Sequence, residues 1–137
     1  MQELRFMLSF PVLILATFFA ASCGSRQGQL QSITLNPASA DAQAYPNGQV
    51  PFTATGYYVD PSHTVTPQPA TWSACFQGIP TTDVSVTTEG VGQCASGASG
   101  TYSIFAFDPS GKMCTDVPVG PCGAQCGVVG TAQLTCP

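Results

Sequence analysis

The sequence has little charge of either sign. Asp, Glu, Lys and Arg make up 7% of the 137 residues, against roughly 25% in ordinary soluble domains. The three basic residues, Arg5, Arg26 and Lys112, are scattered along the chain, which therefore has no basic patch. Binding of nucleic acid and attraction to anionic lipid headgroups both need such a patch and are not expected. Apolar residues account for 44% of the chain, so its composition is not that of a disordered protein.

Catalytic motifs are also lacking. The chain has one histidine, His63, in a loop region rich in proline, and no GxSxG turn, phosphate-binding loop, haem motif or dinucleotide fingerprint. The acidic residues after the N-terminal segment are separated along the chain and do not form an obvious glycosidase pair; they are Asp41, Asp60, Asp83, Glu89, Asp108 and Asp116. We therefore expect a protein that is not an enzyme and has no cofactor.

No apolar run is long enough for an ordinary membrane-spanning helix. The run from Phe6 to Ala21 has 16 residues and contains Pro11, whereas a span needs roughly 20. With Arg5 before it, the run is typical of the apolar part of a signal peptide. We expect export, with cleavage and release or an uncleaved anchor as the alternatives to the form described next.

The residues Ala20-Ala21-Ser22-Cys23 resemble the lipobox of bacterial lipoproteins, although Ala20 stands where the box usually has Leu. The resemblance implies cleavage after Ser22 and acylation of Cys23, by which the protein would be anchored to a membrane. The expected layout is a lipoprotein signal peptide at 1–22, a tether at 23–30 and one domain at 31–137. The expected location is the bacterial cell envelope, either periplasmic or surface-exposed.

Long helical periodicity is absent after the signal segment, and 12 prolines and 14 glycines favour turns. Short runs with period-two alternation predict an all-β sandwich or barrel. The predicted strands are Leu30–Asn36, Val50–Tyr58, Ala70–Cys75, Val84–Thr88, Val91–Cys94, Thr101–Asp108 and Val128–Cys136. Inward positions are Ile33, Leu35, Phe52, Ala54, Trp72, Ala74, Tyr102, Ile104, Ala106, Ala132, Leu134 and Cys136.

Five segments resemble, in order and spacing, the group 2 bacterial Ig-like domain of intimin- and invasin-like surface proteins. They are SITLNPASA (32–40), QVPFTATGY (49–57), ATWSA (70–74), GASGTYSIFAFD (97–108) and GTAQLT (130–135). The resemblance implies an Ig-like β-sandwich of about seven strands, with Trp72 in the core and no catalytic residues. The family typically lacks these cysteines, and the 19-residue insert Pro109–Gly127 replaces its short turn.

The chain has seven cysteines, of which six remain if Cys23 is acylated. In an exported domain they are expected to form disulfides. The alternative of zinc on Cys114, Cys122 and Cys126, and that of calcium on aspartates at one pole, are both less favoured, so no metal is expected.

Ig-like topology assigns these cysteines to two poles of the domain. It puts the insert, the Val59–Gln68 loop and the start of the first strand at one pole, near the membrane, and Pro137 at the other. Because a disulfide needs Cα atoms within about 7 Å, we expect pairing within each pole. The resulting pairs are Cys75–Cys94 and Cys114–Cys126, with Cys136 buried and Cys122 unpaired.

Exposed aromatic residues are the best sign of binding. If Tyr102, Ile104 and Ala106 face the core, Phe105 and Phe107 face outward on a polar sheet face, unless the insert covers them. We expect a structural or interaction module that contacts another envelope protein. The alternative is a carbohydrate-binding module that uses Phe105, Phe107, Tyr57 or Tyr58.

Overall fold

The computed structural model describes residues 28–108, 122 and 127–137. The expected signal peptide, most of the tether and the residues Cys23, Cys114, Cys126 and Asp116 lie outside this part. None of the helices in the described ranges has the length and apolar character that a bilayer-spanning helix needs.

The described chain is built almost entirely of strands. The strands are β1 (Gln29–Asn36), β2 (Ser39–Asp41), β3 (Gln49–Pro51), β4 (Thr53–Val59), β5 (His63–Val65), β6 (Thr71–Phe76), β7 (Ile79–Pro80), β8 (Val84–Val86), β9 (Val91–Cys94), β10 (Gly100–Asp108) and β11 (Val128–Cys136). Two short 3₁₀ helices, Ala42–Ala44 and Pro46–Gly48, join β2 to β3. The prediction of an all-β sandwich is confirmed.

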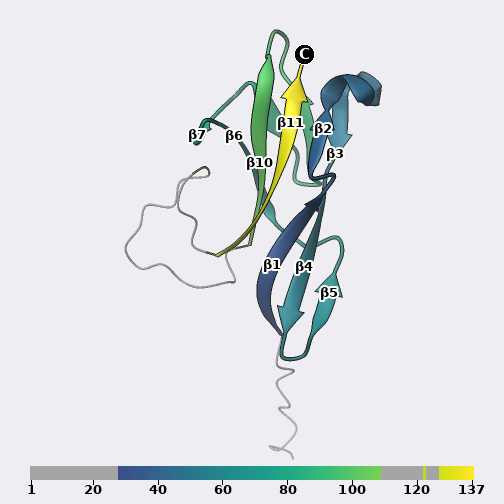
Figure 1. Ribbon diagram of the computed structural model, residues 1–137, viewed down its shortest axis with the longest axis vertical. Coiled ribbons are helices and arrows are strands. Elements are labelled where there is room, and N and C mark those ends of the chain that lie inside the picture. The colour runs from purple at the N-terminus through teal and green to yellow at the C-terminus, as the bar shows by residue number, and fades with distance from the viewer. Residues whose placement is uncertain (1–27, 109–121, 123–126) are drawn as a thin grey trace, which may run out of the picture.

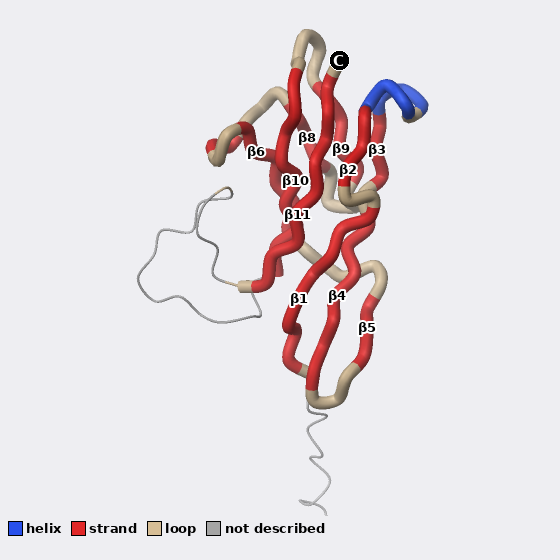
Figure 2. Tube along the Cα trace, in the orientation of Figure 1, coloured by secondary structure: helices blue, strands red, loops and turns tan. Residues whose placement is uncertain are grey.

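The strands form two layers (Figures 1 and 2). One layer is the five-stranded sheet β2-β11-β10-β6-β7, in which β2 runs parallel to β11 and the other neighbours are antiparallel. The other layer consists of two three-stranded sheets, β3-β9-β8 and β1-β4-β5. The second of these extends toward the end of the molecule opposite the C-terminal end of β11 (Figure 1).

Period-two alternation explains the two longest strands. In β10, Tyr102, Ile104 and Ala106 are buried while the residues between them are exposed or half-buried. In β11, Leu134 is fully buried beside Ala132 and Cys136. Successive side chains point to opposite faces of a strand, so this pattern buries one face of the β10–β11 pair. The predicted inward positions of both strands are confirmed.

The predicted strand Val50–Tyr58 is divided in the structure. Phe52 interrupts it, and its backbone N–H donates to the Gly90 carbonyl at 2.9 Å, outside either ladder. The Phe52 ring is buried, as predicted. The break lets β3 pair with β9 while β4 pairs with β1 and β5, so one stretch of chain serves two sheets.

The core lies between the two layers. Its largest fully buried apolar side chains include Phe52, Ile104 and Leu134. Trp72, which the resemblance placed in the core, is only half-buried and packs against it. Gly90, at φ +85°, lies so close to Trp72 that a Cβ would be 2.7 Å from the indole ring. The tight turn before β9 therefore needs glycine for both its backbone angle and its packing.

The two ends of the described chain lie at opposite poles. β1 begins at the pole formed by the β4–β5 turn, and Pro137 lies at the other (Figure 1). This agrees with the poles that Ig-like topology led us to expect for the start of the first strand and for Pro137. The expected loop Val59–Gln68, however, contains β5, which forms a hairpin with β4. A strand of three residues is too short for its alternation to be recognised in the sequence.

Candidate binding surfaces

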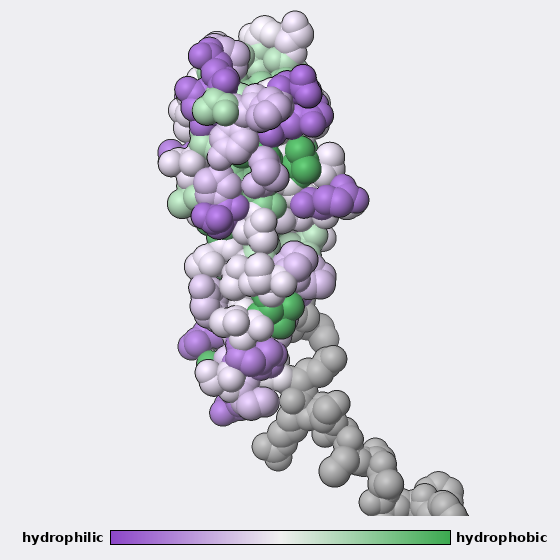
Figure 3. Space-filling model, turned by 90° about the vertical axis from the view of Figure 1, so that its right-hand side faces the viewer, coloured by the Kyte–Doolittle hydropathy of each residue, from purple (hydrophilic) through white to green (hydrophobic). Residues whose placement is uncertain are grey.

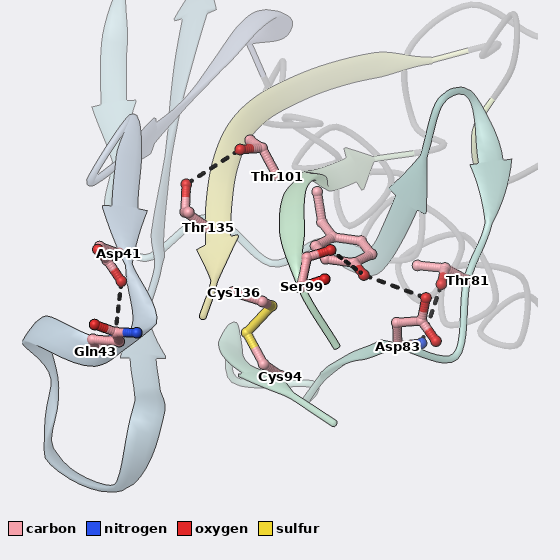
Figure 4. The surroundings of a disulfide bond; sticks show 10 residues. Asp41, Gln43, Thr81, Asp83, Cys94, Ser99, Thr101, Thr135 and Cys136 are labelled. Carbon is pink, nitrogen blue, oxygen red and sulfur yellow. Dashed lines mark hydrogen bonds between the residues drawn. A yellow bond between two sulfur atoms is a disulfide. The ribbon is translucent and has the colours of Figure 1, made fainter. Parts of the chain in front are cut away.

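A disulfide joins the ends of β9 and β11. Cys94 and Cys136 are bonded, with their Cα atoms 5.9 Å apart, and Figure 4 shows the bond between the two strand ends. The predicted pair Cys75–Cys94 is therefore wrong, and so is the prediction of an unpaired Cys136. Both partners still belong to one pole, so the expectation of pairing within a pole holds for this bond.

The second disulfide contradicts that expectation. Cys75 on β6 is bonded to Cys122 of the insert, with a Cα separation of 5.8 Å, so the prediction of an unpaired Cys122 is wrong. Cys75 opposes Ser103 in the ladder, on the outer sheet face, yet it is only 1% exposed. Cys122 therefore lies at the outer face of the sheet beside β6, and not at the pole where β10 ends. The predicted pair Cys114–Cys126 falls outside the described residues.

Phe105 and Phe107 lie on the outer face of the five-stranded sheet, as predicted, but neither is fully exposed. Phe105 opposes Ser73 and Thr131 in its two ladders and is half-buried. Phe107 is also half-buried, and a Cβ on Gly127 would be 2.5 Å from its ring. Since Cys122 is bonded to the same face, these rings are poorer binding candidates than their alternation suggested.

Tyr58 has an internal role. Its ring stacks on His63 with centroids 4.6 Å apart, and its hydroxyl donates to Gln68 Oε1 at 2.9 Å. His63 is exposed and lies in β5, not in a loop, and its Nδ1 is 2.9 Å from the Pro61 carbonyl oxygen. This pair holds the β4–β5 hairpin together and leaves Tyr58 little surface for a ligand.

Gln68 is a buried polar residue that the sequence did not indicate. It is 4% exposed, and its backbone N–H donates to the Ala54 carbonyl at 2.8 Å. Its Nε2 donates to Asp108 Oδ2 at 2.8 Å, while Oε1 accepts from Tyr58. A Cβ on Gly56 would collide with this Oε1. A glycine inside a strand signals close approach of another group, and Gly56 was the one local clue.

Tyr57 is the most exposed of the four predicted aromatic residues, at 41%. It opposes Ser32 on one side and Thr64 on the other, and all three side chains are exposed. Two residues along β4, Thr55 opposes Thr34 and its Oγ1 lies 2.8 Å from Oγ1 of Thr66. We call this surface the hydroxyl face; its members are Ser32, Thr34, Thr55, Tyr57, Thr64 and Thr66.

The hydroxyl face carries no formal charge. None of the residues in β1, β4 and β5 is Asp, Glu, Lys or Arg. In the side view of Figure 3, apolar residues form isolated green spots among white and purple ones and no continuous patch. An exposed ring among hydroxyl groups suits a partner that offers hydrogen bonds and some apolar contact.

Titratable groups with shifted pKa values lie elsewhere. Burial raises the pKa of Tyr102, and the nearby Asp83 carboxylate raises it further. The Tyr102 hydroxyl donates to Asp83 Oδ2 at 3.3 Å and to the Ser99 carbonyl at 3.2 Å (Figure 4). Hydrogen bonds from Thr88 and Thr87 lower the pKa of exposed Glu89. The Glu89 contacts stay within one turn, and the Tyr102 hydroxyl joins β10 to the segment that precedes β8; both arrangements are typical of structural hydrogen bonds.

Within the described ranges, no three or more His, Cys, Asp or Glu side chains gather in a way that would hold a metal ion. Neither a comparison with models of protein families nor a search of curated proteins finds a match to this chain.

Proposed function

We propose that the chain is a lipid-anchored Ig-like module of the bacterial cell envelope that binds another envelope protein and catalyses no reaction. The anchor is the acyl-modified Cys23, reached through the tether at 23–30. The contact surface is the hydroxyl face around Tyr57.

The strand order supports an Ig-like classification. In one layer the pairings run from β1 to β4, and from β3 through β9 to β8. Since β3 and β4 are parts of one predicted strand, this is the A-B-E-D order of a constant-type Ig sheet. In the other layer β6, β10 and β11 have the C-F-G order.

The observation that carries the proposal is the pair of disulfides. Two bonds join positions that are 42 and 47 residues apart, both within or onto the strands of the sandwich. Disulfides of this structural kind persist in oxidising compartments and are rare in the cytosol. They support export, and export is what the N-terminal segment and Cys23 are proposed to provide.

Anchoring is tested by the mass and location of the protein made from the full chain in a bacterial host. We expect it in the membrane fraction, with residues 1–22 removed and fatty acids attached, and with an alkyne analogue of palmitate incorporated. Cys23→Ser should abolish the label and the membrane location together. Recovery of the unprocessed wild-type chain in the cytosol, with reduced cysteines, would overturn the proposal.

The contact surface is tested by photo-crosslinking with a benzophenone amino acid at position 57. We expect one envelope protein to be crosslinked, and the purified partner to bind the wild-type chain but not Tyr57→Ala. The matched control places the same probe at Gln133, which is exposed on the five-stranded sheet. Equal products from both positions would contradict a specific contact at Tyr57.

The alternative of carbohydrate binding by the aromatic residues is favoured by one observation, the 41% exposure of Tyr57. A glycan array separates it from protein binding. Loss of a glycan signal in Tyr57→Ala would favour the alternative. A silent array together with a position-specific crosslink would favour the protein partner.

A further inference from the structure

A shallow depression lies at the pole opposite the start of β1. Its volume is about 410 Å³, within the range of roughly 300–1,000 Å³ that is usual for small-molecule sites. One wall is the segment of 3₁₀ helices between β2 and β3, and the other is the end of β9 with the loop that follows it. Figure 2 shows these helices beside the C-terminal end of β11.

The lining of the depression contains no Asp, Glu, Lys, Arg or His. Its side chains therefore include neither the cations that bind phosphate or carboxylate nor the carboxylates that bind metal ions or amines; Pro137 also lies in the lining. The polar groups are the side chains of Gln43, Asn47, Gln93 and Ser96. The first three are amides, and an amide both donates and accepts hydrogen bonds, as a sugar hydroxyl does.

These amides are exposed and available. In the described part of the chain, no hydrogen bond is formed by the side chains of Gln43, Asn47 or Gln93. Tyr45 supplies the aromatic surface: it is half-buried, packs against the core and also lines the depression. An aromatic surface surrounded by uncharged polar groups fits the apolar face and the hydroxyl rim of a sugar ring.

The walls of the depression are held in place. Cys94 lies in the lining, and its bond to Cys136 ties the end of β9 to β11. On the opposite wall, Asp41 Oδ1 accepts a hydrogen bond from the Gln43 N–H at 2.9 Å and caps the first 3₁₀ helix (Figure 4). A preformed site loses less conformational entropy when a ligand binds. This smaller cost favours binding of ligands that make only weak interactions with a small uncharged site.

We propose that this depression binds a short neutral oligosaccharide, with Gln43 and Gln93 on opposite walls hydrogen-bonded to its hydroxyl groups and Tyr45 against a ring face. The site is separate from Tyr57 and does not depend on the lipid anchor or on the protein partner. An anchored module would then present a sugar-binding end away from its tether.

The test is a titration of the isotope-labelled full chain, with its disulfides intact, followed by backbone amide resonances. The probes are maltotriose, cellotriose and chitotriose, each taken to about 10 mM, above the ~1 mM dissociation constant of a weak site. Trigalacturonic acid is the charged control. We expect saturable shifts at Gln43, Tyr45, Gln93 and Ser96 with at least one neutral trisaccharide and none with the acidic one.

Two variants and a matched control complete the test. Gln43→Ala and Gln93→Ala each remove an exposed amide and should weaken binding about tenfold, the effect of about one hydrogen bond. Gln133→Ala removes an exposed amide from β11 and should leave binding unchanged. The proposal is overturned if no neutral probe shifts these four residues, if the shifts centre on Tyr57, or if the acidic probe binds equally well. None of these results would bear on the anchoring of Cys23.

Discussion

The two parts of the second layer are stabilised in different ways. The β3-β9-β8 sheet contributes the fully buried Val50 to the core and is tied to β11 by the Cys94–Cys136 bond. The β1-β4-β5 sheet has no disulfide among its described residues. It encloses Gln68, a polar side chain, between Gly56, Tyr58 and the end of β10.

The difference shows how a chain with little charge extends a sandwich beyond its main core. Where both layers overlap, apolar side chains such as Phe52 and Leu134 exclude water. At the β1-β4-β5 sheet, one glutamine meets a carbonyl and a phenol from β4 and a carboxylate from β10. A buried polar network of this kind is stable only when each member has a partner. No buried side-chain polar atom in the described ranges lacks one.

The largest effect is expected from removal of the disulfide between β9 and β11. In the chain-entropy model, a crosslink between residues 42 positions apart contributes about 4 kcal/mol. The double variant Cys94→Ala/Cys136→Ala should lose about that free energy of unfolding in urea titrations. Hydrogen exchange should accelerate at the ends of β9 and β11 and hardly change in β4. Equal acceleration in both sheets would show that the contrast between them is not real.

A smaller contrast is expected between two leucines. Leu134 of β11 is completely buried, with 0% solvent exposure, and Leu30 of β1 is 6% exposed. Leu134→Ala should cost about 4 kcal/mol and Leu30→Ala about 2 kcal/mol, since the cost of a cavity depends on how far its surroundings can relax. Chemical unfolding of both variants measures this difference. A larger loss for Leu30→Ala would reverse the assignment of the main core.

The role of Gln68 can be measured with a double-mutant cycle. Gln68→Ala leaves the Tyr58 hydroxyl and Asp108 without their buried amide and should cost about 2 kcal/mol. Gly56→Ala should also destabilise the wild type, because its Cβ would meet Gln68 Oε1. In the Gln68→Ala background that collision is gone, so the second substitution should cost about 1 kcal/mol less. Simple additivity of the two losses would contradict the contact.

The smallest effect is a dependence on alkaline pH that arises at Tyr102 of β10. Burial and the Asp83 charge raise the pKa of Tyr102 in the folded protein, above the value of about 10 for a free tyrosine. The unfolded chain therefore loses this proton first as pH rises. The contribution of Tyr102 to stability is present below about pH 10 and decreases above it.

Urea midpoints at about pH 8 and about pH 11 measure this contribution. The decrease between them should be smaller in Tyr102→Phe than in the wild type. Tyr57→Phe, at an exposed position, is the control and should leave the decrease unchanged. Identical decreases in all three proteins would assign the alkaline sensitivity to other groups.

Local pattern was sufficient to predict the long strands and the sides that they bury. The alternation in Thr101–Asp108 and Val128–Cys136 is repeated often enough to be recognised, and both strands lie where it placed them. It also put Phe105 and Phe107 on the outer face correctly. It could not show that they are half-buried, because their exposure depends on segments that are distant in sequence.

The disulfides were mispredicted for the same physical reason. Pole-by-pole pairing followed from strand order alone and assumed that the insert stays where it leaves β10. Cys122 instead reaches Cys75 on the outer face, and Cys94 thereby becomes available to Cys136. Gln68 gave no sign of burial, since a glutamine in a proline-rich stretch is usually exposed.

By itself, the amino-acid sequence determined the all-β class, the main strands and the alternation of buried and exposed side chains, because each depends on a two-residue repeat along one strand. Tertiary structure alone decided which cysteines are bonded, which aromatic ring is exposed and where Gln68 finds its partners. Those outcomes depend on distances between segments up to 47 residues apart, and a local pattern contains no information about such distances.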